Sequence, residues 1–299
     1  MVFIETPEAT RPNAVIWRWD SYSEYHDYCV GVDDIPGHGG WSSHGKEYGT
    51  DWASADWDKA VSLSRDGWPE GRERVEERME KFKLDVSQRV KEVPVPTLTH
   101  SVAGAFPDIG AFLQGEPESM ITWESLPKSD QIVHLVLNQA ASGSVRGNAI
   151  INKGAALLAF AEFMELHGRR VEITAMDIWL PGHSLGGGVY AESRMPLKRA
   201  DESLQIDQVA FALAHPAAMR RIGFAFAERL AEPWRSAIGL PSMYGGVVDT
   251  KWDRGDVYFG AMSSASFGDA DIHVNWTDDE SANRWLIETL RRSGILEEQ

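Results

Sequence analysis

Ser184 lies in a segment whose residue types and spacing could supply a nucleophile. Gly182-His183-Ser184-Leu185-Gly186 has the G-x-S-x-G spacing. A nucleophilic serine with this spacing sits on a sharp turn from a strand into a helix, which exposes its hydroxyl and aligns a backbone N–H for the oxyanion. Residues 171–180 predict the strand. Residues 189–200, however, alternate in polarity and carry Pro196, which predicts a second strand instead of a helix. We therefore favour a hairpin loop over a catalytic turn.

A serine hydrolase remains an alternative, because acids and a histidine follow Ser184 in the order that a catalytic triad can have. The candidate partners are Asp249, Asp253 or Asp256, and then His273. Labelling of Ser184 by a fluorophosphonate would establish this alternative. On the balance of the two interpretations, the chain is not expected to be an enzyme.

A short run of possible metal ligands lies near the amino end: His26, Cys29, His38 and His44. Structural zinc sites use tighter pairs, such as C-x₂-C with H-x₃₋₅-H. One cysteine with irregularly spaced histidines fits this pattern poorly. We expect loop histidines that hydrogen-bond to the backbone, with no metal and no cofactor.

Aromatic and basic side chains suggest a different chemistry. The chain has twelve tryptophans, and nine of them lie near predicted turns or element ends, where some should be exposed. Exposed aromatic rings stack on bases and nearby cations follow the phosphates, which is what binding of single-stranded nucleic acid requires. The candidate residues for this role are Arg146, Lys153, Arg194, Lys198, Arg199, Arg220, Arg221 and Trp68. Arg194 and Lys198 have equal parity on one predicted strand, so we expect them on one face.

Charge is unevenly distributed along the chain. The net charge is −16, but residues 1–58 and 269–299 hold −13 of it, so the middle is near neutral and could still carry a basic face. The acidic carboxyl end could limit DNA binding or contact a basic partner protein. The single cysteine fits a reducing compartment, and no apolar run is long enough to span a bilayer. We expect a cytoplasmic protein with no membrane partner.

The elements that must position these residues form an alternating pattern. Residues 1–58 are rich in aromatics and turns, and residues 51–91 predict helices with a turn at Asp66–Pro69. From residue 131 strands alternate with helices, which predicts an α/β fold with an open sheet and flanking helices, not an OB-fold. We therefore divide the chain into a loop-rich and helical region at 1–125, packed on the core, and an α/β domain at 126–299.

Residues 132–173 resemble the opening of a von Willebrand factor A-type domain. In that family an Asp-x-Ser-x-Ser loop at the end of a strand holds a divalent cation. Here the loop is Ala140-Ala141-Ser142-Gly143-Ser144, which keeps both serines and lacks the acid. Without a carboxylate we do not expect Mg²⁺ to bind. The resemblance implies the α/β order and, as an alternative function, a non-catalytic protein-interaction module.

Three other segments look like sequences carried by bacteriophages: Trp52–Gly71, Asn152–Ala156 and Ala212–Phe224. In size and acidity the chain is also similar to the Drc-type family of phage single-stranded-DNA-binding RNA polymerase cofactors. That resemblance implies a phage-encoded protein in the host cytoplasm, which binds single-stranded DNA and assists transcription or replication, with a phage RNA polymerase as a further partner. It carries over no binding residue.

Overall fold

The computed structural model describes most of the chain in segments. These are residues 3–5, 14–31, 50–87, 98–104, 106–123, 132–166, 168–179, 190–232, 234–240, 247, 255–262 and 274–292. The expectations that concern Ser184, His273, His38 and His44 lie outside the described residues.

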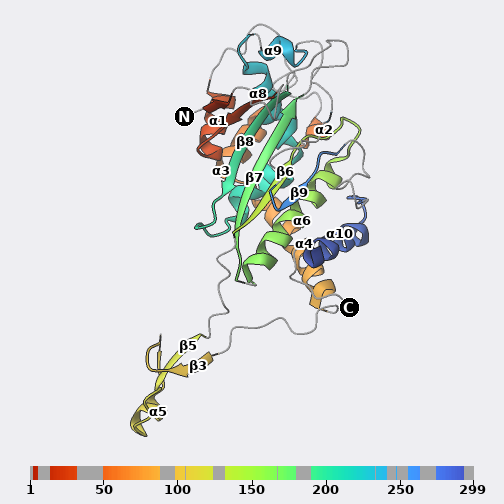
Figure 1. The fold of residues 1–299 in the computed structure, drawn as a ribbon. Coiled ribbons are helices and arrows are strands. Elements are labelled where there is room, and N and C mark those ends of the chain that lie inside the picture. Colours follow the sequence, from red (N-terminus) through yellow and green to blue (C-terminus); the bar gives the residue numbers. More distant parts are fainter. Residues whose placement is uncertain are drawn as a thin grey trace.

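A six-stranded sheet forms the centre of the molecule, in the order β1-β2-β8-β7-β6-β9 (Figure 1). Three neighbouring pairs are parallel (β2–β8, β7–β6 and β6–β9) and two are antiparallel (β1–β2 and β8–β7). The strands span Phe3–Glu5 (β1), Ala14–Arg18 (β2), Ile132–Asn138 (β6), Arg170–Trp179 (β7), Tyr190–Lys198 (β8) and Val257–Phe259 (β9). The expected α/β fold with an open sheet is confirmed.

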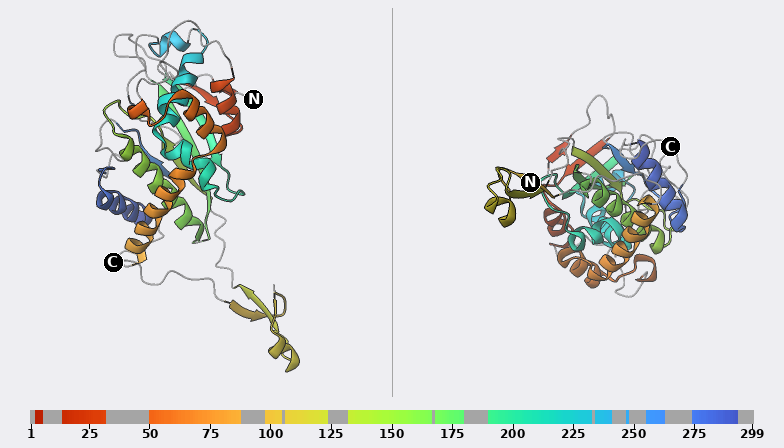
Figure 2. Two further views of the ribbon diagram at one scale, coloured as in Figure 1. Left: turned by 180° about the vertical axis from the view of Figure 1, so that it is seen from behind. Right: turned by 90° about the horizontal axis from the view of Figure 1, so that it is seen from below.

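Helices of the described chain pack on one face of this sheet and share its main hydrophobic core (Figure 2). They are Tyr22–Val30 (α1), Thr50–Ala53 (α2), Trp57–Asp66 (α3), Pro69–Ser87 (α4), Gly147–Leu166 (α6), Ile206–Ala214 (α7), Ala218–Gly223 (the π-helix η1), Phe224–Arg229 (α8), Trp234–Ala237 (α9) and Asp279–Arg292 (α10). The opposite face carries a smaller buried cluster of Val136, Met176, Ile178 and Tyr258. None of the helices in the described segments has the length and apolarity that a bilayer crossing needs.

The predicted hairpin is present, since β7 and β8 are antiparallel and Trp179 pairs with Ala191 across the ends next to the loop. The chain therefore enters a strand at Tyr190, where a nucleophile turn would enter a helix. The ladder contains a bulge: Thr174 faces Pro196 and Ile173 faces Lys198, so Leu197 has no opposite residue. A one-residue bulge reverses the alternation of side chains, so Lys198 lies on the helix-covered face and Arg194 on the other. The prediction that they share a face is wrong.

The expected boundary near residue 125 divides one structural unit. β2 pairs in parallel with β8, and α1, α3 and α4 contribute to the same core as α6 and α7. Val15 and Trp17 of β2, and Trp19 just after it, alternate into the helix-covered core, although the surrounding turn residues concealed this period in the sequence. The amino-terminal segments are thus part of the α/β body.

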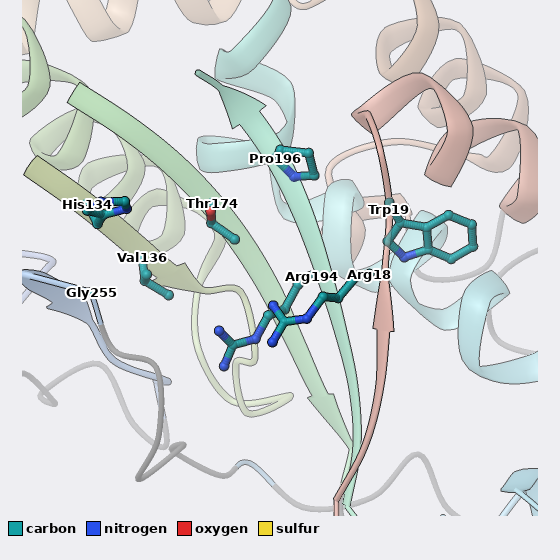
Figure 3. A pocket seen from close by; sticks show the side chains of 8 residues that line it. All are labelled: Arg18, Trp19, His134, Val136, Thr174, Arg194, Pro196 and Gly255. Atoms are coloured by element: carbon teal, nitrogen blue, oxygen red, sulfur yellow. The ribbon is translucent and has the colours of Figure 1, made fainter. Parts of the chain in front are cut away.

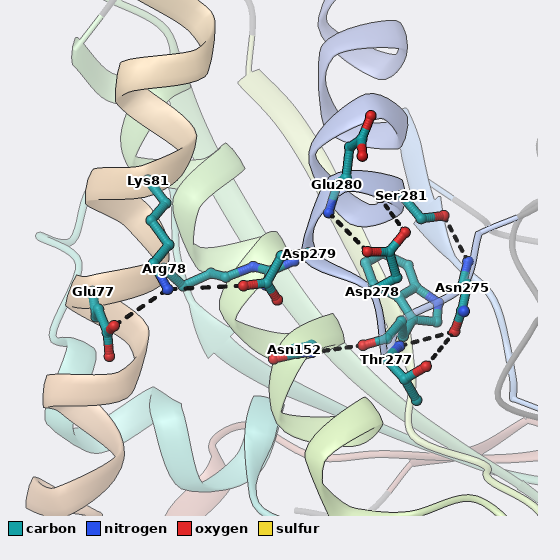
Figure 4. Close-up of polar contacts among 11 residues, drawn as sticks. Glu77, Arg78, Lys81, Asn152, Asn275, Thr277, Asp278, Asp279, Glu280 and Ser281 are labelled. Carbon is teal, nitrogen blue, oxygen red and sulfur yellow. Dashed lines mark hydrogen bonds and ion pairs between the residues drawn. The ribbon is translucent and has the colours of Figure 1, made fainter.

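The acids at the start of α10 are engaged within the body (Figure 4). The Asp278 side chain accepts a hydrogen bond from the backbone N–H of Ser281 at 3.1 Å, which caps the helix. Asp279 pairs with the buried Arg78 of α4, and Lys81 lies 3.8 Å away. Asp278 therefore caps α10, and Asp279 ties α10 to α4.

Residues 98–123 form a small unit that stands apart from the body in Figures 1 and 2 and is called here the projecting module. It contains Leu98–Ser101 (β3), Phe106–Pro107 (β4), Ile109–Leu113 (α5) and Met120–Trp123 (β5), with the sheet order β3-β5-β4. None of its described side chains belongs to either buried cluster.

Candidate phosphate-binding groove

Two of the eight predicted nucleic-acid-binding residues, Arg146 and Arg199, are exposed in the structure. The other six are buried, with at most 7 % of each residue accessible: Lys153, Arg194, Lys198, Arg220, Arg221 and Trp68. Burial speaks against a surface contact with nucleic acid at these six. The cationic atoms of the five basic residues among them bind main-chain carbonyls or carboxylates of the fold.

Lys153 and Arg220 close the loop that follows β6. The Lys153 ammonium donates to the carbonyl of Asn138 at 2.7 Å and to that of Gly260, at the carboxyl ends of two parallel strands. Arg220 donates to the carbonyls of Val145 and Trp52, and its guanidinium carbon lies 4.3 Å from the centre of the Trp52 ring. Burial lowers the pKa of Arg220 to about 10, and it stays protonated near neutral pH. Arg221 similarly donates to the carbonyl of Ala55.

The edge where an open parallel sheet usually binds its ligand is consequently filled. The cavity lined by Asn138, Gln139 and Lys153 is about 20 Å³, which is close to the volume of one water probe. Ala140 occupies the position of the missing acid, and the hydroxyls of Ser142 and Ser144 lie 3.1 Å from each other. Nowhere in the described segments do three or more His, Cys, Asp or Glu side chains gather as a metal site would require.

Trp68 and Lys198 also have structural positions. The Trp68 ring lies edge-on to His215 at 4.7 Å, and the backbone N–H of Trp68 donates to the carbonyl of Asp207. Lys198 forms an ion pair with Glu165 of α6 at 2.6 Å. The exposed Arg199 donates to the carbonyl of Asp20 beside a cavity of about 540 Å³ between α1, α3 and the end of β8. The cations of that cavity thus have partners within the fold.

A groove of about 380 Å³ lies on the sheet face opposite the helices (Figure 3). Arg18 of β2 and Arg194 of β8 are directly opposite in the parallel ladder, and both side chains extend into the groove beside one another. Thr174 and Pro196 form its floor, and His134 stands toward its far side. A groove of this size is within the range of small-ligand sites.

The electrostatics of this groove combine two guanidinium groups with acids at its margins. Arg194 pairs with Glu192, two residues earlier on β8. His134 is half-exposed and its Nδ1 lies 2.8 Å from Glu172 on the neighbouring strand. An anion in the groove would meet both guanidinium groups, of which Arg194 is already paired with Glu192. Guanidinium groups bind phosphate and carboxylate through two parallel hydrogen bonds.

Aromatic stacking has less support at this groove than the sequence suggested. Trp19 contributes to the lining, but its ring points away from the arginines and its indole N–H donates to Ser193 at 2.9 Å. Trp17, Trp68 and Trp276 are also buried, whereas Trp52, Trp57 and Trp234 are partly exposed. The groove is therefore suited to an anionic group more than to a base.

Sequence reasoning found Arg194 but missed Arg18. The signal was present in Val15-Ile16-Trp17-Arg18-Trp19, where Arg18 alternates with tryptophans that enter the core. Because β2 and β8 are about 175 residues apart in the sequence, no local pattern could predict that Arg18 faces Arg194.

The fold and the groove define an α/β protein with helices on one sheet face and an arginine pair on the other. A family model described as a domain of unknown function, DUF7192, matches residues 6–297, and the chain belongs to this family. No curated protein and no solved structure matches the chain.

Proposed function

We propose that the protein is a non-catalytic binding protein whose groove takes a phosphate of single-stranded DNA. The observation that carries the proposal is the in-register pair of Arg18 and Arg194, which extends into a groove on the helix-free face. The similarity to Drc-type cofactors favours single-stranded DNA over other phosphate-bearing ligands. A role in phage transcription or replication is the further step of the same proposal.

The groove also accounts for how an acidic protein could bind DNA. Net charge acts over long range, whereas a guanidinium pair acts at contact distance and is less screened in a recess. Of the acids at the start of α10, Asp279 is paired with Arg78 of α4 and Asp278 caps its own helix, so both have structural partners in the body. The protein would therefore attract DNA only weakly over long range and would bind it through contacts in the groove.

The test is fluorescence anisotropy with a labelled single-stranded oligonucleotide of mixed sequence. Arg18→Gln should weaken binding about ten- to a hundredfold, as expected for losing a charged hydrogen bond worth about 1.5–3 kcal/mol. The matched control is Arg74→Gln, which removes an equal charge from an exposed position on α4. Equal affinity of Arg18→Gln and the unmodified protein would contradict the proposal.

Competition separates the possible sources of the phosphate. Unlabelled single-stranded DNA should displace the probe at a lower concentration than the same sequence as a duplex, a mononucleotide or inorganic phosphate. Displacement by the mononucleotide at an equally low concentration would assign the groove to a small ligand and exclude DNA as the preferred one.

A further inference from the structure

The projecting module exposes an unusual amount of apolar surface. Five of its large hydrophobic side chains are 62 to 78 % exposed: Val102, Phe106, Ile109, Phe112 and Leu113. In the described part of the body, Leu166 is the only comparably exposed large hydrophobic residue. Soluble proteins seldom expose adjacent large apolar side chains without a binding role.

The helix of the module presents part of this surface as a stripe. Ile109, Phe112 and Leu113 have i, i+3 and i+4 spacing, which places them on one side of a helix. Asp108 fixes the start of this helix, since its Oδ1 accepts hydrogen bonds from the backbone N–H groups of Gly110 and Ala111. The cap keeps the turn in place although its apolar side chains face solvent. The stripe is thus held ready for a partner surface.

The charge of the module indicates what such a partner must be. Residues 98–123 contain Asp108, Glu116 and Glu118 but neither lysine nor arginine. Glu116 and Glu118 are exposed just beyond the apolar helix. An anionic lipid surface or a nucleic acid would be repelled, and a second module of the same charge would be disfavoured. A protein surface with an apolar pocket and a basic rim is complementary.

We propose that the projecting module is a docking element for a basic protein partner, which seats the stripe of Ile109, Phe112 and Leu113 in an apolar pocket and pairs its basic rim with Glu116 and Glu118. This site is separate from the groove, because no residue of the module lines the groove. The protein would then have two binding functions on two independent parts. A loss of DNA binding at the groove would leave protein binding by the module intact, and a loss of protein binding would leave DNA binding intact.

The experiment uses the full chain and a labelled amphipathic helical peptide of leucine and lysine, with a leucine–glutamate peptide of equal length for comparison. Phe112→Ser combined with Leu113→Ser should weaken binding of the basic peptide at least tenfold. Glu116→Lys combined with Glu118→Lys should have a similar effect. The matched control is Leu166→Ser, which removes an exposed apolar side chain from the body and should leave the affinity unchanged.

Several outcomes would overturn the proposal. These are equal affinity for both peptides, equal binding by the Phe112/Leu113 variant, or preference for phosphatidylserine vesicles over the basic peptide. A dimer that sediments as such and dissociates in the Phe112/Leu113 variant would assign the stripe to a second copy. All four changed side chains are exposed, so the thermal unfolding midpoint should be unaltered, and an unaltered midpoint would separate a loss of binding from a loss of folding.

Discussion

Asp177 should make the protein less stable as the pH rises toward 8, and Asp177→Asn should remove this effect. The carboxyl group is buried on β7 under the π-helix η1, where a Cβ at Gly223 would lie 2.9 Å from its Oδ2. Its Oδ2 accepts a hydrogen bond from the Tyr25 hydroxyl at 3.1 Å, while its Oδ1 has no hydrogen-bond partner among the described residues. Burial raises the pKa of Asp177 to about 7, because the charged form loses its hydration.

The direction of this pH dependence follows from the Asp177 pKa in the unfolded and in the folded chain. In the unfolded chain the Asp177 pKa is near its ordinary value of 3.8, so the folded protein binds more protons between about pH 4 and pH 7. The neutral carboxyl contributes its full share of the folding stability below the pKa that Asp177 has in the unfolded chain. This contribution is lost as the pH rises to the pKa that Asp177 has in the folded protein. At about 1.4 kcal/mol per pKa unit, the full loss is about 4 kcal/mol, of which about 2 kcal/mol falls between pH 5.5 and pH 8.

The assay is urea unfolding at about pH 5.5 and pH 8, followed by tryptophan fluorescence. Asparagine resembles the protonated acid in shape, so Asp177→Asn should be more stable than the unmodified protein, by about 2 kcal/mol more at pH 8 than at pH 5.5. The difference between the two proteins isolates Asp177 from His215, whose pKa burial lowers to about 4. The exposed Asp201→Asn is the control. If Asp177→Asn raises the free energy of unfolding equally at both pH values, or lowers it at both, the reasoning is refuted.

Two further predictions concern the packing of the body. Gly154→Ala should destabilise the protein by about 1–3 kcal/mol, because its Cβ would lie 2.3 Å from the carbonyl oxygen of Leu213; an unchanged urea midpoint would show that α6 and α7 can separate at no cost. Asp279→Ala should cost about 1–3 kcal/mol, since it leaves Arg78 buried without this carboxylate. Glu280→Ala, at an exposed neighbour on the same helix, should change the midpoint little, and equal effects of the two would contradict this assignment.

Local sequence patterns predicted most of the body and failed where distant segments meet. The strand pattern before the glycine loop and the alternation after it predicted the β7–β8 hairpin. The bulge at Leu197 leaves no local signal, so the face of Lys198 was predicted wrongly. Alternation in a short strand among turn residues also failed to reveal β2.

The candidate site was harder to predict because charge alone does not reveal burial. Lys153 and Arg220 were predicted as DNA-binding cations, but they bind carbonyls supplied by segments far away in the sequence. Arg18 becomes a candidate only when β2 is placed beside β8. The exposed stripe of the projecting module likewise resembles an ordinary short amphipathic segment until the structure shows that it has no core to cover.

The salt dependence of DNA binding by Arg18→Gln tests the central claim most directly. For single-stranded DNA the logarithm of the affinity falls by about 0.7 per logarithmic unit of salt for each phosphate that is neutralised. If Arg18 binds a phosphate in the groove, the slope for Arg18→Gln should be smaller by about 0.7 than the slope for the unmodified protein and for Arg74→Gln. A slope that is the same in all three proteins would contradict a phosphate contact at the arginine pair.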